Sequence, residues 1–189
     1  SIANLVLDTV RELGAIGELS VASGPNSAIP HARTTERTIE KGDVVWLDIV
    51  VYFEDYIADI TRTHFVGKPD SEMLKVFEIV LEAQEIGRTK ARPGMTGAEI
   101  DALCRDYIEQ RGYGKFFTHR TGHGIGLEIH EEPYIVKSNN NRLKSGMTFT
   151  IEPGIYLPGK GGVRIEDGVV LTEDGVRSLT NCERDLLNK

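Results

Sequence analysis

Four carboxylates lie in segments of this sequence that are otherwise apolar and rich in β-branched residues, a pattern typical of buried β-strands. These acids are Asp48, Asp59, Glu152 and Glu166. Burying an unpaired carboxylate costs several kcal/mol or more, so each acid needs a cation or a hydrogen-bonded partner. Arg62 and Arg164 are close enough in sequence to pair with some of the acids, and for any single acid this explanation stays open. Because the four together balance the charge of two divalent cations, we expect these strands to converge on a metal site.

The apolar pattern predicts a mixture of helices and antiparallel strands, an α+β fold. A helix at the start of the chain carries its apolar residues on one face, at Ile2, Leu5, Val6 and Val10. A first strand is expected near Val21. A hairpin follows, with strands over 44–51 and 57–63 joined by a turn at Glu54-Asp55, and each of its strands carries one acid.

Two helices and a second set of acid-bearing strands follow the hairpin. One helix is expected to begin near Ser71. Its buried face is predicted to comprise Leu74, Phe77, Val80 and Leu81. The next helix is bounded by a capping box of Thr96 and Glu99 and by Gly112. Further strands are predicted over 147–152, 162–166 and 168–171. Since each half of the chain combines helices with a strand pair that bears acids, the sequence indicates internal pseudo-symmetry.

Three of the five histidines lie within twelve residues, among glycines. They are His119 and His123, in the octapeptide His-Arg-Thr-Gly-His-Gly-Ile-Gly over 119–126, and His130. Imidazole ligates transition metals, and glycines let the backbone approach a ligand closely. Carboxylates combined with one imidazole suit Mn²⁺, Co²⁺, Fe²⁺ or Zn²⁺. A structural zinc site is not expected, because Cys104 and Cys182 lack the paired spacing that such sites need.

Length, charge and cysteine content narrow the class of protein. A chain of 189 residues fits one domain, and its net charge of −7 argues against nucleic-acid binding. Its apolar runs are much shorter than the roughly 20 residues of a membrane span. Two cysteines are too few for a disulfide framework, so we expect a reduced, cytoplasmic protein that binds neither nucleic acid nor membrane. Because the sequence starts at Ser1 within a helical pattern, we expect residues 1–20 to be a truncated start.

Several motifs together give this chain a specific family resemblance. They are Ala-Ser-Gly-Pro-Asn-Ser over 22–27, Pro30-His31-Ala32, Asp-Ile-Thr-Arg-Thr over 59–63, the octapeptide, His130-Glu131, Ile-Glu-Pro-Gly-Ile-Tyr over 151–156 and Val-Arg-Ile-Glu-Asp over 163–167. In these motifs the chain resembles the pita-bread metallopeptidases. That group comprises methionine aminopeptidases, Xaa-Pro aminopeptidases, Xaa-Pro dipeptidases (prolidases) and the metal-free creatinases. The similarity runs from about Val21 to Leu179, and the proline-specific branch is the most similar.

The resemblance implies a pita-bread fold, with a pseudo-two-fold antiparallel sheet covered by helices. It also implies that residues 1–189 form a single catalytic domain, without the N-terminal domain that proline-specific relatives often carry. We therefore expect one site, built from both halves of the chain.

By the same resemblance, five residues would hold two divalent ions, with Mn²⁺ or Co²⁺ expected first and Zn²⁺ or Fe²⁺ as alternatives. These ligands are Asp48, Asp59, His123, Glu152 and Glu166. The residues that would bond the peptide carbonyl, the tetrahedral intermediate or the departing proline nitrogen are His31, His119 and His130. Glu152 would also carry a proton during catalysis. Arg164 would orient Glu166 or nearby acids, and Tyr56 is a candidate for substrate contact.

The function predicted from these residues is that of a metal-dependent exopeptidase. It would hydrolyse the bond between an N-terminal residue and proline, through a hydroxide bridging the two metals. Its partner would be a peptide with proline at the second position, and a homodimer is one option. Dipeptidase-type members tend to place an arginine for the free carboxylate of the substrate four residues after the equivalent of His130. Tyr134 stands there in this chain, which favours longer peptides.

Two alternatives remain open. One is an enzyme of the methionine aminopeptidase type. The other is a non-catalytic pita-bread binding module or fragment, because Ile49-Val50-Val51 follows Asp48 where the family commonly has a small residue.

Overall fold

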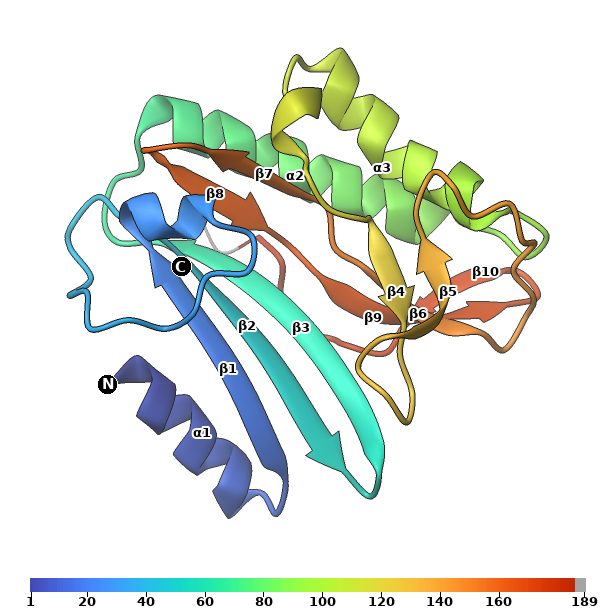
Figure 1. Cartoon of the computed structure of the whole chain (residues 1–189), viewed down its shortest axis with the longest axis horizontal. Helices are drawn as coiled ribbons and strands as arrows, with labels where there is room; N and C mark the ends of the chain where they lie inside the picture. The colour runs from blue at the N-terminus through green and yellow to red at the C-terminus, as the bar shows by residue number, and fades with distance from the viewer. Residues whose placement is uncertain (186–189) are drawn as a thin grey trace.

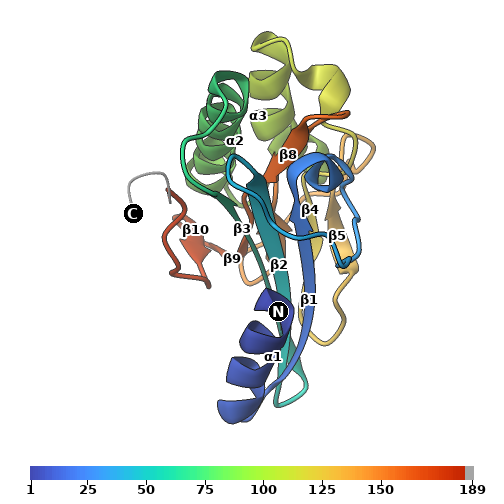
Figure 2. The ribbon, with the colours of Figure 1, turned by 90° about the vertical axis from the view of Figure 1, so that its left-hand side faces the viewer.

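Two antiparallel sheets and a short two-stranded ladder form the framework of the protein, described here over residues 1–185 in a computed structural model (Figure 1). The first sheet has the order β1-β2-β3, with β1 at Ile16–Ser23, β2 at Val44–Phe53 and β3 at Tyr56–Phe65. Helix α1 (Ile2–Glu12) lies beside β1, as both views show (Figures 1 and 2). The β2–β3 hairpin is therefore confirmed, with Asp48 and Asp59 on its two strands.

The second sheet has the order β10-β9-β6-β4-β5. Its strands are β4 (Gly122–Gly124), β5 (Glu131–Ile135), β6 (Thr148–Ile151), β9 (Asp167–Thr172) and β10 (Gly175–Ser178). Within the described residues, strands β7 (Gly154–Leu157) and β8 (Gly161–Arg164) pair only with each other. Helices α2 (Ser71–Lys90) and α3 (Gly97–Gln110) cover one side of these strands, and two 3₁₀ turns, η1 (Gly24–Ala28) and η2 (Gly114–Phe116), complete the described chain (Figure 1).

Strands β6 to β9 form one long hairpin that is interrupted at the same level on both sides. Thr148 pairs with Val170 in the β6–β9 ladder, and Gly154 pairs with Arg164 in the β7–β8 ladder. These two ladders keep one register, so continuing it across the interruption places Glu152 opposite Glu166. Both acids were expected inside strands, but they lie in the two-residue breaks between β6 and β7 and between β8 and β9. The bend turns both carboxylates toward the first sheet.

The main core lies between the two long helices and the second sheet. Phe77, Ile100, Cys104 and Phe149 are fully buried there. The capping box of α3 is present, because the Thr96 side chain accepts from the Glu99 amide and the Glu99 carboxylate accepts from the Thr96 amide. The sequence signals for α3 thus located its start correctly.

Two sequence-based expectations about the first half of the chain were imprecise. The buried stripe of α2 keeps Phe77 and Val80 but uses Met73 rather than Leu74, and Leu81 is only half-buried. The stripe has this position because α2 packs against β6, β7, β8 and β10 at once. The first strand begins at Ile16 rather than near Val21, since β1 pairs with β2 over its whole length, from Ile16 opposite Tyr52 onward.

Two glycines let β4 pass closely between its neighbours. A side chain at Gly122 would overlap the carbonyl oxygen of Thr150 in β6, and one at Gly124 would overlap that of Glu132 in β5. These glycines flank His123, so the close approach expected of the glycine-rich octapeptide is confirmed as a backbone requirement of β4. None of the helices within residues 1–185 is long and apolar enough to cross a membrane.

Replacing Gly122 with alanine should destabilise the fold strongly, because the new methyl group meets backbone that cannot move without breaking the β4–β6 pairing. We expect the free energy of unfolding, measured by urea denaturation, to fall by about 3 kcal/mol or more. Gly168→Ala is the matched control, since the only atom near its added methyl group is the Asp59 carbonyl oxygen at 4.0 Å. Equal losses in the two variants would contradict the steric explanation.

Candidate metal centre

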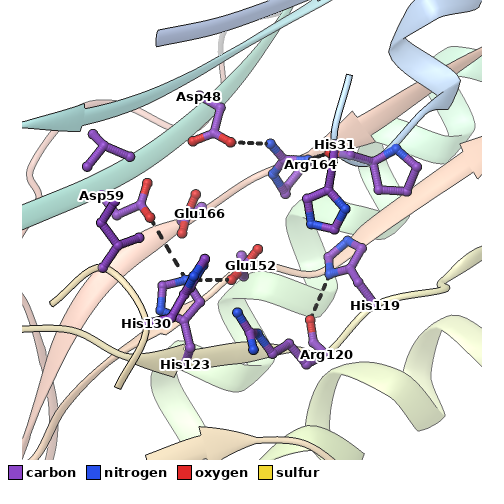
Figure 3. A pocket seen from close by; sticks show the side chains of 13 residues that line it. His31, Asp48, Asp59, His119, Arg120, His123, His130, Glu152, Arg164 and Glu166 are labelled. Atoms are coloured by element: carbon purple, nitrogen blue, oxygen red, sulfur yellow. Dashed lines mark hydrogen bonds and ion pairs between the residues drawn. The ribbon is translucent and has the colours of Figure 1, made fainter. Parts of the chain in front are cut away.

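One cavity of about 510 Å³ collects nearly all of the predicted site residues (Figure 3). Its lining comprises Pro30, His31, Asp48, Val50, Asp59, His119, Arg120, His123, Ile129, His130, Glu152, Arg164 and Glu166. All five predicted metal ligands, the three predicted substrate histidines and Arg164 are therefore brought together. Tyr56 is not among the lining residues, and it is 66% exposed at the start of β3.

Three ligand candidates from distant parts of the chain come within reach of a single ion. One ligand atom each from Asp59, His123 and Glu166 lies within 4.8 Å of the others, and all three residues are buried. Asp59 comes from β3, His123 from β4 and Glu166 from the break between β8 and β9. The separate sheets thus each contribute to one group of hard and borderline ligand atoms, which suits a divalent transition metal.

The backbone fixes which nitrogen of His123 faces the cavity. Nδ1 lies 3.1 Å from the carbonyl oxygen of Gly124, which can only accept, so Nδ1 carries the proton. In the neutral ring, Nε2 then has the free lone pair, and it lies 3.2 Å from Glu152 and 3.9 Å from Asp59. This arrangement is common among metal-binding histidines, because a fixed tautomer orients the ligand.

The acids of the cavity repel one another in the metal-free protein. Burial, with the charges of Asp48 and Glu152, raises the pKa of Asp59 to about 8. Burial and the charge of Asp59 also raise the pKa of Glu166 well above its ordinary range. Within residues 1–185, Asp59 Oδ1 is buried without a hydrogen-bond partner. An unpartnered buried oxygen among repelling carboxylates fits bound cations, so the residues present match the metal that the ligand set implies.

Glu152 behaves differently from its two neighbours. Although burial opposes ionisation, the hydrogen bond with His123 and the nearby positive charges hold the pKa of Glu152 at about 2. Burial lowers the pKa of the His123 imidazole, but the same bond, the charges of Glu152 and Asp59 and the hydrogen bond to the Gly124 carbonyl together raise it above its ordinary value. Glu152 also accepts a 3.1 Å hydrogen bond from Thr150 Oγ1. Hence Glu152 stays ionised at neutral pH, whereas the raised pKa values of Asp59 and Glu166 favour their protonated forms.

Arg164 forms hydrogen bonds along the wall of the cavity beside Asp48. Its guanidinium donates to Asp48 Oδ2 at 2.7 Å, to the Pro30 carbonyl and to the hydroxyl of Tyr156. It also donates to Thr61 Oγ1, which in turn donates to Glu166 Oε2 at 2.6 Å. Arg164 therefore contacts Asp48 directly and Glu166 through Thr61.

His119 is tied to the chain at both ring nitrogens. Its Nδ1 lies 2.7 Å from the Arg120 carbonyl, so Nδ1 carries the proton and Nε2 accepts from the Tyr156 hydroxyl at 2.9 Å. Burial lowers the pKa of His119 to about 4, which keeps this tautomer neutral at pH 7. The contact with substrate predicted for His119 would require one of these two bonds to open.

The other two histidines stand at the mouth of the cavity. His31 and His130 are both exposed, and the His130 ring lies edge-on to the His123 ring at 4.4 Å between centroids. No hydrogen bond to either imidazole occurs within residues 1–185. Both are therefore available to a ligand.

A buried ion pair supports the site from the opposite face of its strands. Arg62 donates to Asp167 Oδ1 at 2.8 Å and to the backbone carbonyls of Thr61, Glu166 and Cys182. Asp167 is fully buried and also accepts from Gln84, Thr180 and Arg184. This pair connects β3, which carries Asp59, to the chain at Glu166 and Asp167. It also connects both to the segment 180–184.

Sequence reasoning missed three residues that hold predicted site residues in place: Thr61, Thr150 and Tyr156. Thr61 lies two residues after Asp59 on β3, and Thr150 of β6 lies two residues before Glu152, so each faces the same side as that acid. A period-two polar pattern next to Asp59 and Glu152 could have identified them. Nothing in the sequence brings Tyr156 to His119, because that contact depends on how β7 packs against η2.

Comparison with known proteins relates most of the chain to one family. The family model of metallopeptidase family M24 matches residues 1–173. The Xaa-Pro dipeptidase of Pyrococcus furiosus is 50% identical over 167 residues, which is 88% of this chain and 48% of the relative. An Xaa-Pro dipeptidase structure from Bacillus anthracis matches with a TM-score of 0.96 at 46% identity, covering 98% of this chain and 53% of that one.

Two further structures bear on the fold and on the choice between branches. An X-Pro aminopeptidase structure from Thermotoga maritima matches with a TM-score of 0.95 at 46% identity, covering 97% of this chain and 53% of that one. A methionine aminopeptidase structure from Rickettsia prowazekii has a TM-score of 0.83 at 23% identity and covers 95% of this chain and 84% of that one. This is a likeness of fold alone. The predicted α+β pita-bread fold is confirmed. This chain spans about half the length of the curated relatives it matches.

The raised pKa values of Asp59 and Glu166 give the metal-free protein a pH-dependent stability. Between the pKa of an unfolded carboxyl and the raised value, the folded state binds more protons than the unfolded state, so stability falls as pH rises. Histidines with lowered pKa values oppose this trend only below about pH 6.5. From pH 7 to 8 we expect the free energy of unfolding to fall by about 1.4 kcal/mol per pH unit for each proton that the folded state holds and the unfolded state does not. Urea unfolding in the presence of a chelator measures this slope.

Saturating Mn²⁺ should flatten this slope, because bound cations keep the carboxylates ionised, and Asp59→Asn should reduce it without metal. A metal-free protein whose stability does not change between pH 7 and 8 would contradict the assigned protonation.

Removing the counter-charge of Arg62 should destabilise the strands that carry the ligands. In Asp167→Asn the fully buried site keeps a guanidinium without its carboxylate, and we expect a loss of about 3 kcal/mol or more in chemical denaturation. Asp174→Asn, at an exposed turn position, should change stability by less than about 0.5 kcal/mol. If the two variants unfold at the same denaturant concentration, the ion pair does not support the site as described.

Proposed function

Because this chain belongs to metallopeptidase family M24, we propose that it is a metal-dependent exopeptidase that hydrolyses the bond between an N-terminal residue and proline. One observation carries the proposal. The five predicted ligands and the two free histidines line a single cavity, although they come from distant parts of the chain. Relatives named Xaa-Pro dipeptidase, at 46–50% identity over most of this chain, support proline as the second residue.

The ligand assignment is part of the same proposal. Asp48, Asp59, His123, Glu152 and Glu166 would hold two divalent ions, Mn²⁺ or Co²⁺ before Zn²⁺ or Fe²⁺. When bound, the ions would supply a water of lowered pKa, polarise the scissile carbonyl and neutralise the carboxylates. The unpartnered Asp59 oxygen and the crowding of acids in one cavity support this assignment.

The remaining chemistry falls to side chains of the chain itself. Glu152, ionised at neutral pH, can accept a proton and return it to the departing proline nitrogen. His31 and His130, at the mouth of the cavity, can donate hydrogen bonds to the peptide carbonyl as charge develops on its oxygen. Arg164 would hold Asp48 in place, and the neutral His119 would position the hydroxyl of Tyr156.

Some features of the whole protein remain predictions. These are the single catalytic domain over 1–189, a contact of Tyr56 with substrate, a homodimer and a cytoplasmic location. The location is supported by two thiols, buried Cys104 and exposed Cys182, that form no disulfide in the described residues.

Hydrolysis assays on a small set of peptides test this function. The chain loaded with Mn²⁺ or Co²⁺ should cleave Ala-Pro and Ala-Pro-Ala, and activity should disappear on metal removal and return on re-addition. Asp59→Asn should reduce kcat/KM by more than about 100-fold, because it removes a buried anionic ligand candidate. Asp106→Asn, an exposed change of the same chemistry on α3, should leave activity unchanged.

Each alternative predicts a different result. Cleavage of Met-Ala peptides in preference to Xaa-Pro peptides would favour the methionine aminopeptidase type. Two metals bound per chain without any turnover would favour a non-catalytic module. Hydrolysis of Ala-Pro that survives complete metal removal would refute the mechanism.

A further inference from the structure

Two arginines line the cavity, and they differ in their surroundings. Arg164 is almost fully buried, and every nitrogen of its guanidinium donates a hydrogen bond. Arg120 is half-buried, and within residues 1–185 its guanidinium makes no hydrogen bond or ion pair. Figure 3 shows the Arg120 side chain extending into the cavity on the side of His123. A cation is thus held inside the site without a counter-charge.

An aromatic ring holds this cation in position. The guanidinium carbon of Arg120 lies 5.0 Å from the centroid of the Tyr134 ring, within the range of a cation–π interaction. The backbone on both sides is fixed, since the Arg120 carbonyl accepts from His119 and the Thr121 amide donates to the Ile135 carbonyl. This contact uses no hydrogen-bond acceptor, so the N–H groups of the Arg120 guanidinium stay free to donate.

The charge of the cavity explains why a free cation is needed there. The other charged groups that line it are four acids, whose mutual repulsion raises the pKa values of Asp59 and Glu166, and one arginine already paired with Asp48. A ligand that carries a carboxylate would be repelled by the acids unless a separate cation binds it. The planar guanidinium of Arg120 matches a carboxylate in two parallel hydrogen bonds.

We propose that Arg120, stacked on Tyr134, is the residue that recognises a carboxylate of the peptide substrate. This inference rests on the proposed exopeptidase function and adds a substrate class to it. The carboxylate is either the C-terminal one of a dipeptide, which lies one residue beyond the scissile bond, or that of an acidic N-terminal side chain. If the carboxylate is the C-terminal one, the preference for longer peptides inferred from Tyr134 is reversed, because Tyr134 supports the cation instead of replacing it.

Binding of uncleavable analogues tests the proposal without depending on turnover. Ala-Pro with a reduced CH₂–N scissile bond, as the free acid and as the C-terminal amide, is titrated calorimetrically into the Mn²⁺-loaded chain. A second pair compares Glu-Pro-amide with Gln-Pro-amide in the same reduced form. We expect the wild type to bind the carboxylate-bearing member of one pair about 10- to 100-fold more tightly. The pair that shows this preference identifies the source of the carboxylate.

Variants then assign the preference to Arg120. Arg120→Gln should abolish it, Arg120→Lys should keep part of it, Tyr134→Leu should weaken it and Tyr134→Phe should retain it. Arg111→Gln is the matched control, because Arg111 also lies over a tyrosine ring, that of Tyr107 at 4.4 Å, but outside the cavity.

Each remaining outcome is also informative. A wild type without preference in either pair, or an Arg120→Gln variant that keeps the preference, would overturn the assignment. If the preference and its loss are seen but the wild type cleaves no Xaa-Pro peptide, Arg120 keeps its role and the proposed function fails instead.

Discussion

Repulsion among buried carboxylates is the constraint on which the rest of this structure depends. Asp59 and Glu166 keep their protons up to a raised pKa because they are buried and share one cavity with two further acids. The surrounding chain offers hydrogen-bond donors to three of the four acids and leaves one oxygen of Asp59 without any in the described region. Protons or divalent cations can relieve this repulsion, so cations that bind the folded state would also stabilise it.

The two faces of the ligand-bearing strands divide the work of chemistry and support. On β3, Asp59 and Thr61 face the cavity, while Arg62 faces the opposite side and pairs with Asp167. Asp167 directly follows Glu166, so the same alternation occurs at the bend of the long hairpin. Because successive side chains of a strand point to opposite faces, one buried ion pair can hold two ligand candidates in place without entering the cavity.

The sequence predicted those parts of the site that follow from local patterns. The β2–β3 hairpin, the capping box of α3 and the close passage of backbone beside His123 could all be inferred from residue types and spacing. The contacts of Tyr156 and of Arg62 could not, because their partners lie 37 and 105 residues away and depend on how the sheets pack. The face of α2 was misjudged for a similar reason, since several strands, rather than the helix itself, select which residues are buried.

The uninterrupted register of the long hairpin also limits where this chain can change in length. Glu152 and Glu166 face each other only because equal numbers of residues separate them from the turn that follows Leu157 and precedes Gly161. One residue added within β7 or β8 would shift the register, so that Glu152 and Glu166 would no longer lie opposite each other. One of the two carboxylates would then point away from the cavity. Extra residues at the tip, over 158–160, would leave the opposition intact. The tip is therefore the natural position in this hairpin for an inserted loop or a grafted peptide.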